Sequence, residues 1–328
     1  MTNWFFKTLE TGLKPLIPLS YGSPGFKIKQ KNFAPEELQV DMTGKICLVT
    51  GANSGIGFET ALAFAQKGAE VWLLCRNEQR GEAAREKIVT TSQNQAIHLA
   101  IVDMSERSSI REFCTHFPRP QIDILVQNAA VMPDEHFSTS DGLELTLATN
   151  LVGPFLLTQL LLPKLRAAKA ARVILVSSGG MYAQKLDLHT IETPKHPFDG
   201  VIQYAQTKRA MVILNELWAS RYPNDNIDFH CMHPGWGDTP AVRSSLPRFW
   251  KVTQSILRTP EQAADTVIWL GCAPSITGLS GHFWFDRGKQ KTHILPWTRE
   301  SEEVRAELWE KCCFWSGWKE SVSADKSM

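Results

Sequence analysis

Across most of the chain, short apolar runs alternate with longer segments whose apolar residues recur at helical spacing. The runs predict strands at Ile46–Thr50, Glu70–Cys75, Ile97–Val102, Ile124–Val126, Val173–Ser177, Ile227–Met232 and His282–Phe285. The longer segments predict helices at Gly55–Lys67, Glu78–Thr90, Ser105–His116, Gly142–Lys169 and Ile202–Arg221, and a further helix that starts after Thr259. Strands are apolar throughout when both faces of their sheet are covered, and regular alternation with helices favours parallel pairing. The pattern therefore predicts an α/β protein with a doubly wound parallel sheet, the Rossmann fold.

The same pattern sets the limits of one domain. We expect an N-terminal extension at residues 1–43, the Rossmann-fold domain at residues 44–290 and a C-terminal tail at residues 291–328. Aromatic residues in a polar tail usually dock onto the body of the protein or onto a partner. The tail carries five of them, Trp297, Trp309, Phe314, Trp315 and Trp318.

The first residues, Met1–Ser20, are moderately apolar but interrupted by charged residues and prolines. They lack the apolar core of a signal peptide, so we expect a packed or frayed extension, with peripheral membrane contact as the alternative. Lys27, Lys29 and Lys31 follow as a basic strip, for which a solvated face is the expected role. No apolar run approaches the ~20 residues that cross a bilayer, so no transmembrane span is predicted.

Composition narrows the class of protein. Of the 328 residues, 43% are hydrophobic and 21% are charged, and the formal net charge is +1, values typical of a globular protein that does not bind nucleic acid. The seven cysteines are odd in number and include no Cys-x-x-Cys pair, so neither a disulfide framework nor a metal site is predicted. These features favour an intracellular setting, with the cytoplasm preferred over membrane-surface or organelle association.

A glycine-rich turn follows the first predicted strand and precedes the first predicted helix. The segment reads Gly51-Ala-Asn-Ser-Gly-Ile-Gly57. Glycines let the backbone turn sharply and approach a ligand closely, and a helix N-terminus offers free N–H groups to a phosphate. The turn is therefore predicted to bind a dinucleotide through Gly51, Asn53, Ser54, Gly55, Ile56 and Gly57.

Arg76 bears on which dinucleotide is bound. An acid at the end of the second strand would bind the adenosine ribose of NAD, but this position holds the neutral Cys75. Arg76 comes next and can meet a 2′-phosphate with its charge and its forked donors. NADP(H) is therefore favoured over NAD(H), and an ordinary solvated arginine is the alternative reading of Arg76.

Tyr204 and Lys208 stand four residues apart on a predicted helix, so their side chains share one face. A tyrosine with a pKa of ~10 is a poor base near neutrality. A lysine charge ~4 Å away would lower this pKa by about 3 units at an effective dielectric constant of ~20. Ser178 ends the strand upstream of this helix and can polarise a substrate oxygen, with Ser177 as the alternate serine.

These motifs together resemble the short-chain dehydrogenases/reductases, from about Gly44 to Phe285. The turn shares the spacing Gly-x-x-x-Gly-x-Gly with the cofactor loop of that family, and Tyr-x-x-x-Lys is its reactive pair. The resemblance implies hydride transfer between a nicotinamide cofactor and a carbonyl or alcohol. It implies a catalytic set of Asn150, Ser178, Tyr204 and Lys208, in which Asn150 holds a water that relays protons to Lys208.

The resemblance also implies further cofactor contacts. Asp103 and Met104 would hold the adenine. The alternative role for Asp103 is to cap the next helix, a role that Ser105 could also take. Asn128 would be a structural or cofactor-side residue, with Gln127 and Ala130 as departures from the family pattern. The nicotinamide amide would be clasped by Pro234, Gly235 and Thr239. His233 is left out of the reacting groups, because Tyr204 already supplies an acid and base.

The sequence therefore predicts an NADP(H)-dependent oxidoreductase that acts on a small-molecule carbonyl or alcohol. Leu246, Phe249 and Trp250 lie in a segment expected to border the pocket, which favours an apolar substrate. The alternative is a catalytically silent NADP(H)-binding regulatory or scaffold protein. A homodimer is expected from the fold, unless the aromatic residues of the tail cover the pairing helices.

Overall fold

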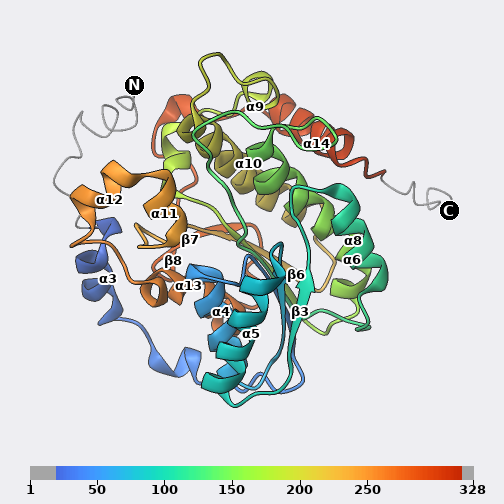
Figure 1. Ribbon diagram of the computed structural model, residues 1–328, viewed down its shortest axis with the longest axis vertical. Coiled ribbons are helices and arrows are strands. Elements are labelled where there is room, and N and C mark those ends of the chain that lie inside the picture. Colours follow the sequence, from blue (N-terminus) through green and yellow to red (C-terminus); the bar gives the residue numbers. More distant parts are fainter. Residues whose placement is uncertain (1–19, 320–328) are drawn as a thin grey trace.

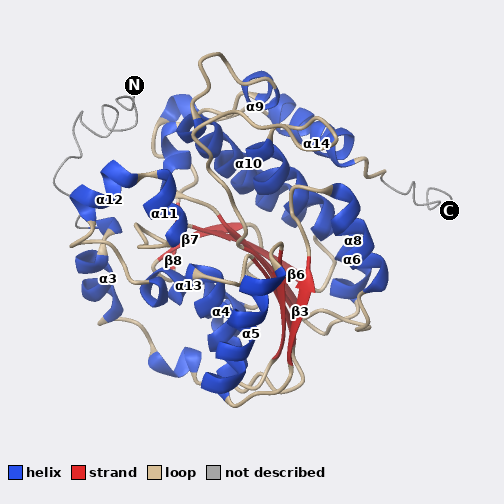
Figure 2. Ribbon diagram, in the orientation of Figure 1, coloured by secondary structure: helices blue, strands red, loops and turns tan. Residues whose placement is uncertain are grey.

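The computed structural model describes residues 20–319 as one α/β domain around a single sheet (Figures 1 and 2). The sheet order is β3-β2-β1-β4-β5-β6-β7-β8, parallel throughout except for the antiparallel pair β7 and β8. The strands are β1 (Ile46–Thr50), β2 (Glu70–Cys75), β3 (Ile97–Ile101), β4 (Ile124–Gln127), β5 (Ala171–Val176), β6 (Ile227–Met232), β7 (His282–Phe285) and β8 (Gly288–Gln290). The predicted doubly wound parallel sheet is confirmed, and the short strand β8 is an addition to it.

Helices cover both faces of the sheet. One face packs against α4 (Gly55–Gln66), α5 (Glu78–Ser92) and α13 (Pro260–Cys272). The other packs against α6 (Arg107–His116), α8 (Gly153–Arg166) and α10 (Gly200–Arg221). Strand β1 shows why both faces must be covered, since Leu48 belongs to one core and Cys47 and Val49 to the other. Shorter helical elements are α3 (Ser23–Gln30), η1 (Pro35–Leu38), η3 (Gly179–Ala183), α9 (Leu188–Glu192), α11 (Pro240–Ser245), α12 (Pro247–Thr253), η4 (Pro274–Ile276) and η5 (Pro296–Thr298).

Three helix starts differ from the sequence-based prediction, among them that of α10, which begins at Gly200 rather than Ile202; α4, α5 and α13 begin as predicted. The expected helix at Gly142–Lys169 is instead α7 (Leu145–Leu147), a π-helical turn η2 (Ala148–Val152) and α8. Helix α6 begins after Glu106 rather than at Ser105, whose N–H and hydroxyl both donate to Asp103. Helix α13 begins after Thr259, as predicted, with a capping box in which Thr259 and Gln262 exchange hydrogen bonds.

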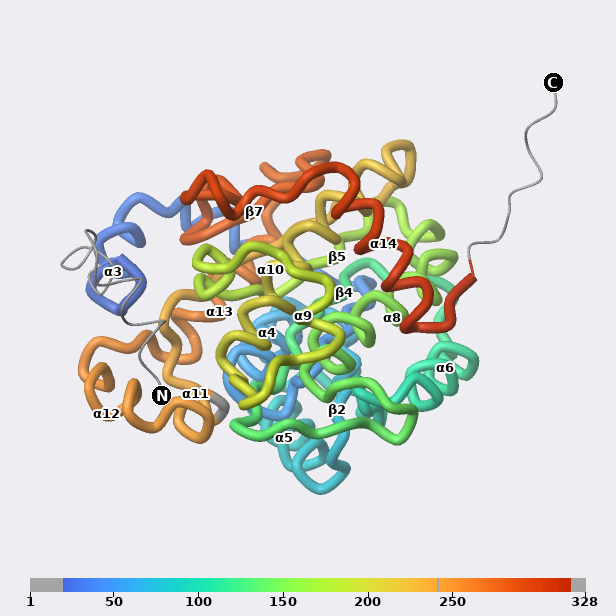
Figure 3. Tube along the Cα trace, turned by 90° about the horizontal axis from the view of Figure 1, so that it is seen from above, coloured from blue at the N-terminus to red at the C-terminus, as the bar shows by residue number. Residues whose placement is uncertain are grey.

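The N-terminal segment, residues 20–43, docks onto the body beside α12 (Figure 3). The carbonyl of Tyr21 accepts from the Trp236 N–H at 2.9 Å and from the Arg258 Nε–H at 2.9 Å, and the Ser23 N–H donates to Ile256. Arg258 is itself buried in an ion pair with Asp286. The segment from Tyr21 onward is therefore packed; the expectation for Met1–Ser20 falls almost wholly outside the described residues.

The tail forms α14 (Glu302–Ser316), which packs against α8 and α10 (Figures 1 and 3). Trp309 and Trp315 are buried, so the predicted docking of the tail aromatics is confirmed for them. Trp297 and Phe314 are 67% and 77% exposed, so these two do not dock onto the body, and their docking onto a partner stays a prediction.

Among residues 20–319, one helical stretch has the length and composition of a membrane span. It runs from Leu145 to Arg166, with a mean hydropathy of 1.6 in its most apolar window, of which 89% is buried in the protein. This burial marks it as a core helix under the sheet, where an all-apolar helix is expected.

Candidate active site

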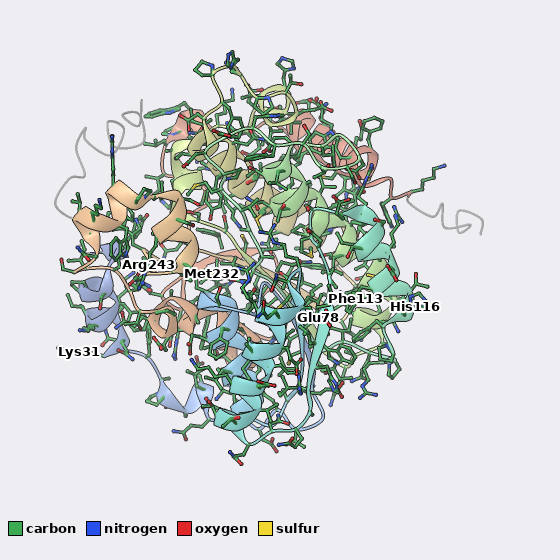
Figure 4. The ribbon with its side chains drawn as sticks, viewed as in Figure 1. Lys31, Glu78, Phe113, His116, Met232 and Arg243 are labelled. Atoms are coloured by element: carbon green, nitrogen blue, oxygen red, sulfur yellow. The ribbon has the colours of Figure 1, made fainter. Side chains whose placement is uncertain are left out.

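The residues singled out in the sequence gather at the carboxyl edge of the sheet. Most of them come shortly after one of the strands β1 to β6, and parallel strands bring their carboxyl ends to the same edge. The others, Asn150, Tyr204 and Lys208, lie on η2 and α10. Met232, the last residue of β6, lies near the middle of the molecule in Figure 4. The edge beside it is where an open parallel sheet binds its ligands.

The glycine turn has the geometry of a phosphate cradle. Gly51 and Gly55 have φ of +65° and +57°, a region that other residues rarely adopt. A Cβ on Gly57 would lie 2.5 Å from the Gly51 carbonyl oxygen, so the turn closes only with glycine there. Ser54 is the N-cap of α4, but its hydroxyl accepts no hydrogen bond from the N–H groups of the first turn. These N–H groups therefore lack a side-chain acceptor at the N-cap. These features fit a pyrophosphate.

The glycine turn also contacts the end of β2. The N–H groups of Ala52 and Asn53 donate to the thiol of Cys75, whose pKa burial nevertheless raises to about 11. Ser54 is exposed, and Ile56 packs against the core under α4. The backbone of Asn53 is therefore tied to the end of β2, where the adenosine end of a dinucleotide would lie.

Asn128 fixes the turn from the next strand. Its Nδ2 donates to the carbonyls of Thr50 and Gly51 at 3.0 and 3.3 Å. In return, the Thr50 hydroxyl accepts from the N–H groups of Asn128 and Ala129, at 2.9 Å each. The Asn128 side chain therefore holds the carbonyls of the turn in place. This is a structural role, one of the two roles expected for Asn128; the other was a contact with the cofactor.

Arg76, Asp103 and Met104 lie along the adenosine side of the edge. Arg76 is exposed and forms no ion pair among the described residues. Asp103 accepts from the N–H and hydroxyl of Ser105 at 2.8 and 2.6 Å, so the acid braces the turn before α6. Met104 is buried, and its carbonyl lies where a Cβ on Gly153 would be. The alternative of a Ser105 cap is wrong, since Glu106 is the N-cap.

Tyr204 and Lys208 lie on α10 as expected from their spacing. The Lys208 side chain is 1% exposed, and its Nζ donates to the Val176 carbonyl at 2.8 Å. The same Nζ lies 5.4 Å from the centroid of the Tyr204 ring. Lys208 is thus anchored to the end of β5 and stands beside the phenol without a direct bond to it.

The protonation of this pair differs from the expectation. Burial raises the pKa of Tyr204 to about 12, and the hydrogen bond with Ser178 only partly lowers it. Burial also lowers the pKa of Lys208 to about 8. The prediction that Lys208 lowers the tyrosine pKa is therefore wrong for the structure described, because desolvation penalises both charged forms. Tyr204 is a phenol that can donate a proton.

The two serines after β5 face different partners. Ser178 is partly exposed, accepts from the Gly180 N–H at 3.3 Å and hydrogen-bonds with Tyr204. Ser177 is buried, and its hydroxyl donates to the Lys208 carbonyl at 2.9 Å. Ser178 is therefore the serine beside the phenol, and Ser177 fixes the strand to α10.

Asn150 lies in the π-helical turn and is fully buried. Its Oδ1 accepts from the Val131 N–H at 2.8 Å, and its Nδ2 donates to the Val131 carbonyl at 2.9 Å and to Thr207 at 3.3 Å. The side chain thus joins the loop after β4 to α10, one residue before Lys208. π-helical turns inside α-helices occur frequently at functional sites.

The loop after β6 lies beside the serine loop, because β5 and β6 are neighbouring strands. Gly235 has φ of +79° and packs directly on the Arg258 guanidinium, where a Cβ would not fit. Thr239 caps α11 by accepting from the Val242 N–H at 3.3 Å, and its Cγ2 lies 3.3 Å from where a Cβ on Gly55 would be. Thr239 at the start of α11 therefore packs against the glycine turn.

Sequence reasoning missed three residues that shape this loop. His233 accepts hydrogen bonds from Gly179 and Gly235, and Tyr21 and Arg258 hold the loop from outside. Only the position of His233, directly after a strand and before Pro-Gly, was a signal in the sequence. The contacts of Tyr21 and Arg258 join segments 237 residues apart, which no local pattern records.

Comparison with known proteins identifies the class. A family profile described as short chain dehydrogenase matches residues 45–248, so the chain belongs to the short-chain dehydrogenase family of oxidoreductases. It is 42% identical over 306 residues to dehydrogenase/reductase SDR family member 12 of Bos taurus, covering 93% of both chains. It is 32% identical to retinol dehydrogenase 11 of Homo sapiens, covering 84% of this chain and 86% of the relative.

Solved structures share the fold. A short chain dehydrogenase from Escherichia coli CFT073, complexed with NADPH, aligns with a TM-score of 0.62 at 24% identity, over 76% of this chain and 99% of that one. A protein from Mycobacterium paratuberculosis aligns with a TM-score of 0.69 at 22% identity, over 86% of this chain and 97% of that one. The Rossmann architecture of the family is thus common to all three.

Proposed function

We propose that this protein is an NADPH-dependent reductase of an apolar carbonyl compound. The observation that carries the proposal is the placement of Tyr204 beside Ser178, with the buried Lys208 on the same helix, at the edge that also holds the glycine turn. A phenol with a pKa of about 12 is a proton donor over the whole physiological range. This state suits reduction, in which a developing alkoxide takes up a proton.

The cofactor site is argued from the chain's own residues. The N-terminus of α4 and the glycine turn would take the pyrophosphate, and the exposed Arg76 would meet a 2′-phosphate. Asp103 and Met104 would border the adenine, and Pro234, Gly235 and Thr239 the nicotinamide amide. The NADPH-bound Escherichia coli structure has the same fold, which supports NADP(H) as the nucleotide. When bound, NADPH supplies the hydride.

The reacting groups act on the substrate oxygen. Ser178 and Tyr204 both donate hydrogen bonds to the carbonyl oxygen, which holds it and polarises the bond to carbon. As negative charge develops on that oxygen, the Tyr204 hydroxyl passes its proton to it. The ammonium of Lys208 then stabilises the phenolate that is left on Tyr204. In alcohol oxidation the same steps run in reverse.

Aromatic side chains near the site favour an apolar substrate. Trp236 stands directly after the Pro234–Gly235 segment and packs edge-on against Phe249, with ring centroids 5.1 Å apart. Phe249 is itself buried, and Leu246 is half-buried between α11 and α12. Relatives named retinol dehydrogenase are consistent with a long apolar alcohol or aldehyde. We therefore propose a retinoid-like, steroid-like or fatty carbonyl as the substrate class.

Exposed apolar side chains on α3 and α12 suit an intracellular enzyme that touches membranes. Ile28 on α3 is 66% exposed and Val252 on α12 is 83% exposed, and both neighbour exposed lysines, Lys27 and Lys251. Exposed apolar side chains flanked by cations are typical of surfaces that meet anionic lipid. Peripheral membrane contact is therefore part of the proposal, and an apolar substrate could be delivered there.

Turnover with a panel of apolar aldehydes and ketones tests the proposal. We expect oxidation of NADPH to follow the loss of carbonyl for at least one class in the panel. NADPH binding without turnover across the panel would contradict reduction and support the silent binding protein instead.

The nucleotide preference rests on Arg76. We expect Arg76→Ala to weaken NADPH binding about tenfold or more and to leave NADH binding nearly unchanged, because only NADPH has the 2′-phosphate. Isothermal titration of both nucleotides measures the preference. Arg119→Ala is the matched control, since Arg119 pairs with Glu70 at the opposite end of β2. An unchanged ratio of the two affinities in Arg76→Ala would refute this assignment.

A further inference from the structure

His233 connects the loop after β5, which carries Ser178, to the loop after β6. It directly follows β6, and its own N–H donates to the Trp284 carbonyl at 3.0 Å. Its ring Nδ1 accepts from the Gly179 N–H at 3.0 Å and from the Gly235 N–H at 3.3 Å. Gly179 is the neighbour of Ser178, and Gly235 belongs to the proposed nicotinamide segment. One nitrogen atom therefore ties the serine loop to the nicotinamide loop.

The ring that carries this atom is held on several sides. It is 3% exposed, stacks on Phe285 with centroids 4.8 Å apart, and meets the edge of Tyr21 at 4.7 Å. A Cβ on Gly179 would lie 2.9 Å from its Nε2, so only glycine allows the serine loop to come this close. Because the ring is enclosed, neither loop can shift without breaking a hydrogen bond to Nδ1 or displacing aromatic neighbours.

The hydrogen bonds also fix the protonation of the ring. An Nδ1 that accepts from two N–H groups carries no proton, so the neutral ring has its proton on Nε2. Burial, with smaller contributions from the cations Arg258 and Lys29, lowers the pKa of His233 to about 3. Asp286 pairs with both cations and is the acid nearest to them. Near neutrality His233 therefore has the protonation state of an acceptor.

We propose that His233 is a positioning residue, which sets the distance between Ser178 and the nicotinamide by accepting from both loops at one atom. The proposal rests on the proposed reductase function. It assigns the ring no proton transfer and no contact with substrate. Its effect is on geometry, since a misplacement of about 1 Å between reacting groups can cost about 100-fold in rate.

Two substitutions separate positioning from packing. His233→Phe keeps a buried ring against Phe285 and Tyr21 but leaves both N–H groups without an acceptor. His233→Asn loses the ring but places its Oδ1 close to where Nδ1 lies. We expect His233→Phe to lower kcat about 100-fold with less than about a threefold change in the NADPH Kd, and His233→Asn to recover about tenfold of that loss. A packing role predicts the reverse order, with Phe more active than Asn.

His230→Phe is the matched control. His230 is also a buried histidine of β6, but neither of its ring nitrogens has a hydrogen-bond partner. We expect its turnover to stay within about twofold of the wild type. Wild-type kcat in His233→Phe, or equal losses in the Phe and Asn variants, would overturn the proposal.

A second measurement does not depend on turnover. In ¹⁵N-histidine-labelled protein, the spectrum of His233, assigned by its loss in His233→Phe, should show a proton on Nε2 and none on Nδ1 from about pH 5 to 8. A proton on Nδ1, or titration near pH ~6.5, would overturn the proposal even if no substrate is found. Absence of wild-type turnover with the expected spectrum would instead count against the reductase function and leave the hydrogen-bond arrangement intact.

Discussion

At the scale of single residues, the site is shaped by the cost of burying charge. Tyr204 and Lys208 share one face of α10. Burial raises the pKa of Tyr204 and lowers that of Lys208, so it disfavours the charged form of each. The spacing of the two residues was visible in the sequence, and so was the pairing with Ser178. The direction of the tyrosine shift was not, because it depends on desolvation by segments that pack around α10 only in the folded protein.

The buried charge of Lys208 is expected to lower the free energy of unfolding of the protein. Its pKa falls from 10.5 in the unfolded chain to about 8 in the fold, so the folded protein releases this proton first as the pH rises. The penalty is fully present below about pH 8 and disappears as the pH rises past 10.5. We expect Lys208→Met to raise the free energy of unfolding at pH 7 by about 1 to 3 kcal/mol and to abolish turnover.

Urea denaturation at pH 7 and pH 10 measures this effect. The gain from Lys208→Met should be smaller at pH 10, where the wild-type lysine is mostly neutral in the fold. A variant less stable than the wild type at pH 7 would show that the hydrogen bond to Val176 outweighs the burial of the charge.

At the scale of elements, the parallel strands follow the apolar runs closely, because each run is buried on both faces of the sheet. Helix limits agree less well. The predicted helix at Gly142–Lys169 contains a π-helical turn, which lets Asn150 reach the loop after β4 and lets Gly153 approach the Met104 carbonyl. Periodicity alone cannot show such a turn, since it depends on contacts with other elements.

The glycine turn gives the prediction at this scale. Gly57→Ala would place a Cβ 2.5 Å from the Gly51 carbonyl oxygen and 2.6 Å from the Asn128 Nδ2, so the turn must open. We expect NADPH binding to weaken about tenfold or more, because the N–H groups of the cradle move from their positions. Gly288→Ala is the control, since its nearest contact is 3.5 Å, ordinary van der Waals distance. Wild-type NADPH affinity in Gly57→Ala would mean that the turn does not hold the phosphates.

At the scale of the whole molecule, two segments outside the predicted domain complete it. The N-terminal segment holds the loop after β6 through Tyr21, and α14 covers α8 and α10. Trp309 packs edge-on against Phe155 of α8 at 5.2 Å, and Arg107 donates to the Trp315 carbonyl at 2.7 Å. The aromatic composition of the tail predicted docking, but the location of the docking surface required the structure.

This covering bears on self-association. Because α14 packs on α8 and α10, those helices are not free to pair with a second copy, so we expect the full chain to be monomeric at micromolar concentration by light scattering. A chain ending at residue 299 should self-associate or aggregate, because the surface under Trp309 and Trp315 becomes exposed. A stable dimer of the full chain would show that pairing uses another surface or that α14 moves aside.

The most direct test of the account is the Tyr204→Phe variant, compared with the wild type for NADPH binding and for carbonyl reduction. We predict that the NADPH Kd changes less than about threefold and that kcat falls by about 1,000-fold or more, because only the proton donor is removed. Tyr204→Phe protein that binds NADPH normally and retains most of the wild-type kcat would contradict the assignment of Tyr204 and, with it, the proposed reaction.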